Sequence, residues 1–166
     1  LEVLKDPKSE GNIEDIKLQV ETLLELRDAM NLAVNMINTV EIVRSELDSI
    51  IPKLIKKSDR EKAQLLSKAA QSIASSLYDI HLTGAREDAF RSPMQLYGRL
   101  SSLASDLSGH GIDFKPTDQQ REVQVIFNKR LKVVEEKFQK YIKKEVSELN
   151  TQLKKSKLKI DTEKKL

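Results

Sequence analysis

Cysteine and tryptophan are absent from this chain, and aromatic residues make up only 4% of its 166 residues. Without cysteine the chain can form neither a disulfide nor a thiolate metal site. Glycine occurs five times and proline four times. This composition favours long helices joined by aliphatic seams over a thick globular core. No apolar run has the length that a membrane-spanning helix needs.

Motifs for catalysis are also lacking. The only histidines are His81 and His110, which are too far apart in sequence to form an i, i+4 zinc pair. The sequence has no nucleophile elbow, no P-loop and no glycine-rich dinucleotide turn. Glu135 and Glu136 are adjacent, so on a helix they diverge and cannot share acid–base work. We therefore predict no catalytic, cofactor-binding or metal-binding residue, and no enzymatic activity in this chain.

The charge is uneven along the chain. The residues from Arg121 onward hold 14 of the 29 Lys and Arg but only 7 of the 26 Asp and Glu. The basic character therefore belongs to the last helix and tail. The basic tail from Lys154 to Leu166 lacks the aromatic side chains on which nucleic-acid bases stack, so we expect no nucleic-acid partner. The apolar stripes have the width of bundle seams, which argues against a membrane-surface role.

The longest uninterrupted pattern runs from Ile13 to Leu54, without glycine and with proline only at position 52. Apolar residues at spacings of three and four predict one amphipathic helix of about 60 Å. A rod of this length must pack against other helices to be stable. The predicted core stripe consists of Ile16, Val20, Leu23, Met30, Val34, Ile37, Val40, Leu47, Ile51 and Leu54.

Capping signals and periodicity predict four helices in all, near residues 12–51, 59–81, 93–108 and 117–155. Asn12 is placed to cap the first helix, and Thr117 with Gln120 forms a capping box for the fourth. Ser58 or Asp59 and then Ser92 are the expected caps of the other two. The residues predicted to be buried are Val34, Ile37, Leu66, Leu100, Val134 and Phe138.

The fold class that follows is all-α, an antiparallel up-and-down bundle in which the first and fourth helices are long and the other two short. Residues 12–155 form the bundle. Residues 1–11 are interpreted as the last strand of an upstream β-domain and a linker, and residues 156–166 as a flexible Lys-rich tail. We expect the two long helices to pair antiparallel at a thin end, with Val20 near Val146 and both termini emerging there.

Asn31 and Asn38 lie seven residues apart, on the same side of the first helix. One interpretation is a polar binding track. The alternative, which we favour, is interhelical hydrogen bonding that fixes register, as buried asparagines do in coiled coils.

Several short motifs resemble a known family. They are Leu-Glu-Val-Leu-Lys-Asp-Pro-Lys at 1–8, Asn-Met-Ile-Asn at 35–38, Ser-Pro-Met-Gln-Leu-Tyr at 92–97 and Pro-Thr-Asp-Gln-Gln-Arg at 116–121. With Val-Arg-Ser-Glu-Leu at 43–47 and Ser-Glu-Leu-Asn-Thr-Gln-Leu at 147–153, the chain resembles the C-terminal helical region of bacterial BNR-repeat, or sortilin-like, β-propeller proteins, often labelled glycosyl hydrolases. The resemblance implies a secreted or envelope-associated parent whose chemistry lies on the propeller. None of the matched motifs is catalytic, and the Lys-rich end departs from the family's pattern.

Three functions follow as expectations. The leading one is a non-catalytic structural or interaction module, which packs against the upstream β-propeller or β-domain of the same protein or against another protein. The second is an independent coiled-coil adaptor or oligomerisation domain that forms a homo-oligomer. The third is an accessory domain that lines the cleft of a propeller glycosidase.

Overall fold

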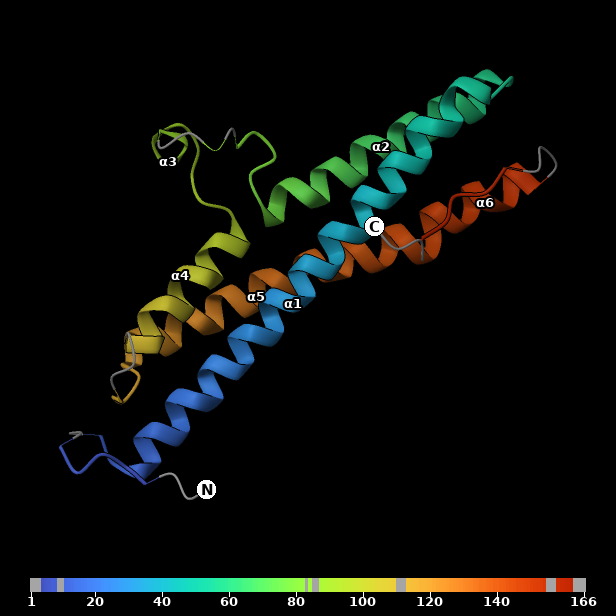
Figure 1. Cartoon of the computed structure of the whole chain (residues 1–166). Coiled ribbons are helices and arrows are strands. Elements are labelled where there is room, and N and C mark those ends of the chain that lie inside the picture. Colours follow the sequence, from blue (N-terminus) through green and yellow to red (C-terminus); the bar gives the residue numbers. More distant parts are fainter. Residues whose placement is uncertain are drawn as a thin grey trace.

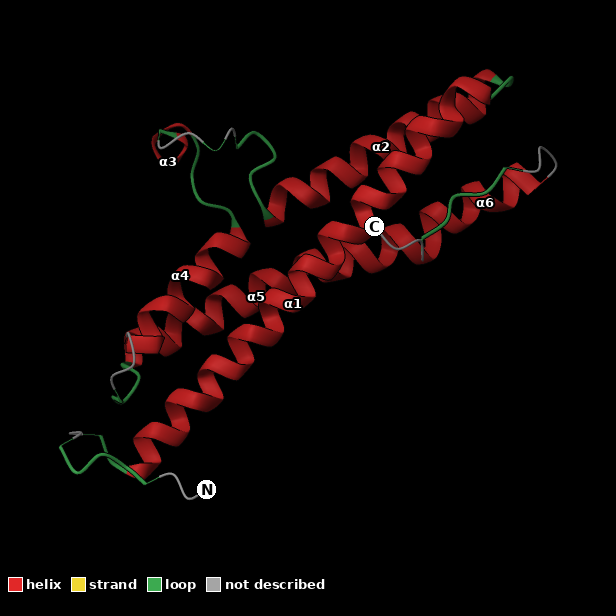
Figure 2. Cartoon of the chain, viewed as in Figure 1, coloured by secondary structure: helices red, strands yellow, loops and turns green. Residues whose placement is uncertain are grey.

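The computed structural model describes residues 4–8, 11–82, 84, 87–109, 113–154 and 158–162. Every regular element in these ranges is helical, and none of the described residues forms a strand (Figure 2). The all-α prediction is therefore confirmed. Leu4, Lys5 and Asp6 have no regular structure, while residues 1–3 of the predicted strand lie outside the described ranges.

Four helical rods account for most of the chain. The first consists of α1 (Ile13–Ile50) and a 3-10 turn (Ile51–Lys53), and the second is α2 (Lys57–Leu77). A single turn, α3 (Asp88–Arg91), interrupts the connection to α4 (Leu96–Ser108). The last rod joins α5 (Asp118–Lys140), a π-helical turn (Tyr141–Val146) and α6 (Ser147–Leu153). The long rods contain 41 and 36 residues, as predicted for the first and fourth helices.

The predicted caps Asn12 and Thr117 are confirmed, and each of them forms a capping box. Asn12 Oδ1 accepts from the Asp15 amide at 2.8 Å, and the Asp15 carboxylate accepts from the Asn12 amide. Thr117 and Gln120 make the same reciprocal pair. The other predicted caps are wrong because α2 begins at Lys57 and α4 at Leu96, each without a side-chain cap. Gly109 ends α4 in the left-handed conformation that favours glycine (φ +54°), as expected.

The rods run up, down, down and up (Figure 1). α2 returns along the second half of α1, and α4 continues in the same direction along the first half of α1. Gln19 of α1 donates a hydrogen bond to the main-chain carbonyl of Leu107, so the end of α4 lies beside the first turns of α1. Gln124 near the start of α5 donates to Glu25 near the start of α1. The fourth rod therefore runs parallel to α1.

The predicted thin end, with the first and fourth helices antiparallel and Val20 near Val146, is wrong. Lys62 near the start of α2 lies 3.9 Å from Glu148 of α6, so the fourth rod ends beside the α1–α2 hairpin. The third helix was expected to climb beside the second. Instead α4 runs in the same direction as α2. The fourth rod therefore runs parallel to α1, opposite to the predicted direction.

The core joins all four rods. Leu66, Leu100 and Val134 are buried as predicted, whereas Ile37 and Phe138 are half-buried and Val34 is exposed. The second half of the α1 stripe is confirmed at Val40, Leu47 and Leu54. In the first half, Val20 and Val34 are wrong because they are exposed, while Leu23, Met30 and Ile37 are half-buried and pack against the edge of the core. Other residues on the side turned to the core are buried. These are Gln19, Thr22, Leu26, Ala29, Ala33 and Met36.

The segment after α6 folds back on it. Ile160 is fully buried, and its amide donates to Asn150 Oδ1 at 2.7 Å while its carbonyl accepts from Asn150 Nδ2 at 3.0 Å. The predicted flexible tail over residues 156–166 is therefore wrong for residues 158–162. The remainder of that tail lies outside the described residues.

Candidate functional site

The outer side of α1 carries an apolar surface that the other described rods cover only at its edge, where Leu23, Met30 and Ile37 pack against the core. Its members recur at helical spacing, so they share one side of the helix. We call this surface the open face; its exposed members are Ile13, Val20, Leu24 and Val34, and its half-buried members are Ile16, Leu23, Met30 and Ile37. Val20 is 48% exposed and Leu24 is 43% exposed. Six of these eight residues belong to the stripe that the sequence assigns to the core.

Polar contacts on the opposite side of α1 hold the open face outward. Gln19 and Thr22 are buried there, and Gln19 Nε2 bonds to the Leu107 carbonyl at 2.7 Å. Gln124 of α5, also buried, donates to Glu25 at 2.8 Å. Rotating α1 to bury the open face would break both contacts and leave buried amide groups without partners, which is costly.

Asn31 and Asn38 lie along the open face rather than inside the bundle. Both are exposed, so they do not fix the register of helices within this chain. The favoured interpretation, hydrogen bonding between helices, is therefore wrong for contacts inside the bundle. They belong to a row in which spacings of four and three alternate. The row contains Ile13, Lys17, Val20, Leu24, Arg27, Asn31, Val34 and Asn38, all of them exposed.

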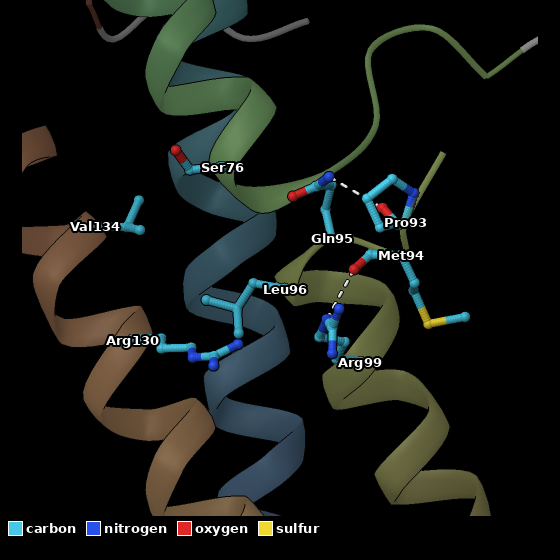
Figure 3. Close-up of a pocket in the computed structure, with 8 residues that line it drawn as sticks. All are labelled: Ser76, Pro93, Met94, Gln95, Leu96, Arg99, Arg130 and Val134. Atoms are coloured by element: carbon cyan, nitrogen blue, oxygen red, sulfur yellow. Dashed lines mark hydrogen bonds between the residues drawn. The ribbon is translucent and has the colours of Figure 1, made fainter. Parts of the chain in front are cut away.

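A second candidate site is a pocket of about 180 Å³ where α2, α4 and α5 meet (Figure 3). Arg99 of α4 and Arg130 of α5 line it, and no lining residue is acidic. We call it the arginine pocket. Arg99 Nε donates to the Met94 carbonyl at 2.8 Å, and Gln95 Nε2 donates to the Pro93 carbonyl at 3.0 Å. These two bonds hold residues 93–95, which precede α4 and form one wall of the pocket.

Glycine at position 98 keeps that wall close to α4. A Cβ at Gly98 would lie 2.6 Å from Met94 Cγ, closer than real contacts allow. The Met94 side chain therefore packs directly over the first turn of α4. The sequence does not single out Arg99 or Arg130, since they come from different helices and form no motif.

No three His, Cys, Asp or Glu side chains within the described residues are close enough to hold a metal ion. His81 is exposed, its amide bonded to Asp79 Oδ1 at 2.8 Å, and His110 lies outside the described residues. Glu41 pairs with Arg44 at 3.2 Å, the pair expected from their spacing, and also accepts from the Tyr78 hydroxyl at 3.3 Å. This cluster joins α1 to α2.

Among the described helices, none has the length and apolarity to cross a membrane. Comparison of the chain with protein-family models, with curated proteins and with solved structures gives no match.

Proposed function

We propose that this chain is a non-catalytic helical interaction module and that the open face of α1 is its docking surface. The open face supports this proposal because exposed aliphatic side chains gathered on one surface mark binding sites more often than scattered ones do. Val20, Leu24 and Val34 would each contribute roughly 1 kcal/mol or more when removed from water. Catalysis forms no part of this proposal.

The occupant that we propose is the β-domain that the family resemblance places upstream, in a secreted or envelope-associated protein. The open face occupies the first half of α1, which directly follows residues 4–8 and 11 in the chain. A domain joined there lies within reach of Ile13, Val20 and Leu24. If the β-domain docks on the open face, the bundle lies along the side of that domain and does not extend away from it.

The test is to express residues 1–166 and the β-domain as separate chains and to measure their association by calorimetry. Replacing Leu24 with Glu should weaken binding at least about tenfold, because it removes an apolar contact of about 1 kcal/mol and also places an unpaired carboxylate in the interface, and together these exceed the 1.4 kcal/mol that a tenfold change represents. Leu65→Glu is the matched control, because Leu65 is 67% exposed on α2, away from the open face. Equal affinities for wild type and Leu24→Glu would overturn the proposal.

Oligomerisation is the second candidate, and the exposed row on α1 favours it. Its alternating spacings of four and three are those of a coiled-coil seam, and Asn31 and Asn38 occupy equivalent positions. In a parallel dimer each asparagine would face the same asparagine of the other chain. Sedimentation velocity decides between the two candidates: a dimer that Leu24→Glu dissociates supports self-association, whereas a monomer at all concentrations excludes it.

A further inference from the structure

We propose that the arginine pocket binds a single anionic group, a carboxylate or a phosphate, between Arg99 and Arg130. This site is separate from the open face and does not depend on the proposed docking function. Three features of the pocket support this proposal: the charge of its two arginines, their hydrogen-bond donors and the size of the pocket.

The first observation is uncompensated charge. Two guanidinium groups line one small pocket, and none of its lining residues is acidic. Within the described residues neither arginine forms an ion pair with a carboxylate. Figure 3 shows that the two side chains reach the pocket from different helices. An anion bound between them would neutralise charge that no carboxylate of the described residues pairs.

The second observation concerns donor groups. Arg99 uses Nε for the Met94 carbonyl, so its two terminal nitrogens keep their hydrogens for a ligand. That bond also holds the guanidinium in place. Planar guanidinium groups recognise carboxylates and phosphates through paired N–H···O bonds. The pocket therefore offers a positioned donor from α4 and a second set of donors from α5.

The third observation is the shape of the site. A volume of about 180 Å³ is well above what one water molecule needs, so the pocket has room for one carboxylate or phosphate group. Leu96 and Val134 are buried and form an apolar side of the pocket. Arg99 and Arg130 are themselves exposed, so an anion can reach them from solvent.

The start of α4 adds a smaller contribution. Leu96 is the first residue of this 13-residue helix, and no side chain caps its free amides. The positive end of the helix dipole thus lies at the rim of the pocket and favours the same sign of ligand.

The test follows the side-chain Nε–Hε signals of Arg99 and Arg130 by nuclear magnetic resonance in the full chain. Sodium phosphate and sodium acetate are titrated separately at constant ionic strength, with sodium chloride as the reference salt. We expect saturable shifts of both arginine signals with phosphate or acetate and none with chloride. The anion with the lower dissociation constant identifies whether the site prefers phosphate or carboxylate.

Variants make the test specific. Arg99→Gln and Arg130→Gln should each weaken binding about tenfold or more, as expected for one lost charge-assisted contact. Lys129→Gln removes the same charge from an exposed α5 position that does not line the pocket. It should bind as wild type does. Unsaturable shifts, or equal losses in Lys129→Gln and the arginine variants, would overturn the proposal in favour of general screening.

Discussion

The phenolic hydroxyl of Tyr141 donates a hydrogen bond of 3.1 Å to the main-chain oxygen of Leu66. Tyr141 is the first residue of the π-helical turn and only 2% exposed, and Leu66 lies near the middle of α2. This contact joins the last rod to the second and fixes the level at which they meet. Together with the Gln124–Glu25 bond it establishes the parallel course of α1 and the fourth rod.

Removing the Tyr141 hydroxyl should cost little, and removing the ring should cost much more. Tyr141→Phe loses one hydrogen bond, so we expect a decrease of about 0.5–1.5 kcal/mol in the free energy of unfolding. Tyr141→Ala also leaves a cavity, and we expect about 3–5 kcal/mol. Urea denaturation measures both. Tyr97→Phe, on an exposed position of α4, is the control and should change stability little; an equally small effect of Tyr141→Ala would contradict this packing.

The same tyrosine makes stability depend on alkaline pH. Burial, and then the neighbouring charge of Glu145, raise the pKa of Tyr141 well above its ordinary value. The folded state therefore holds this proton more tightly than the unfolded chain, whose tyrosine titrates near pH 10. This contribution is fully present below about pH 10 and is lost as the pH rises through the higher folded-state pKa. Above about pH 10 the wild type should lose stability more steeply than Tyr141→Phe, and parallel curves would contradict this assignment.

The segment after α6 should contribute to stability, contrary to what its lysines indicate. Ile160→Ala removes a fully buried side chain, and we expect a loss of about 2–5 kcal/mol. Lys159→Ala, next to it and exposed, is the control and should have almost no effect. Thermal unfolding followed by circular dichroism compares them. A melting temperature that is the same for both variants would mean that the segment does not dock.

The direction of the fourth rod can be measured with spin labels at two exposed positions, Glu21 and Ser147. Gln124 lies level with Glu25, and Ser147 lies a further 23 residues along the rod. At the standard helical rise the labels should be roughly 40 Å apart. Double electron–electron resonance gives this distance. A separation below about 15 Å would instead support the antiparallel pairing of the two long helices that the sequence predicts, because the axes of neighbouring helices lie about 8–10 Å apart.

Local features were predictable from sequence, and long-range ones were not. Asn12 and Thr117 cap helices through residues three positions away, so their effect is visible in a short stretch of sequence. The direction of α4 depends on the 78–95 connection, where no local signal distinguishes a continued descent from a reversal. Ile160 docks through its buried side chain and its hydrogen bonds to Asn150, and it lies within a charged segment that has no apolar periodicity.

The open face shows why periodicity misassigned the first half of α1. This helix has apolar residues on more than one side, and the pattern also selects residues that are exposed, such as Val20 and Val34. The helices pack instead on Ala29 and Ala33, because small side chains let neighbouring rods approach closely. Buried Gln19 and Gln124 then fix the rotation through hydrogen bonds. A hydrophobicity pattern carries no information about these specific polar contacts.

Solvent access to the open face is the most direct measurement of the docking proposal. Methyl groups of Val20, Leu24 and Val34 are observed by nuclear magnetic resonance with a soluble paramagnetic agent, first in this chain alone and then in the intact parent protein. Relaxation should be enhanced in the isolated chain, where these side chains are exposed, and the docking proposal predicts that it is suppressed in the proposed parent, where a β-domain would cover them. Leu65 should respond equally in both. Equal enhancement of the three open-face residues in both proteins would show that nothing docks there and would contradict the account.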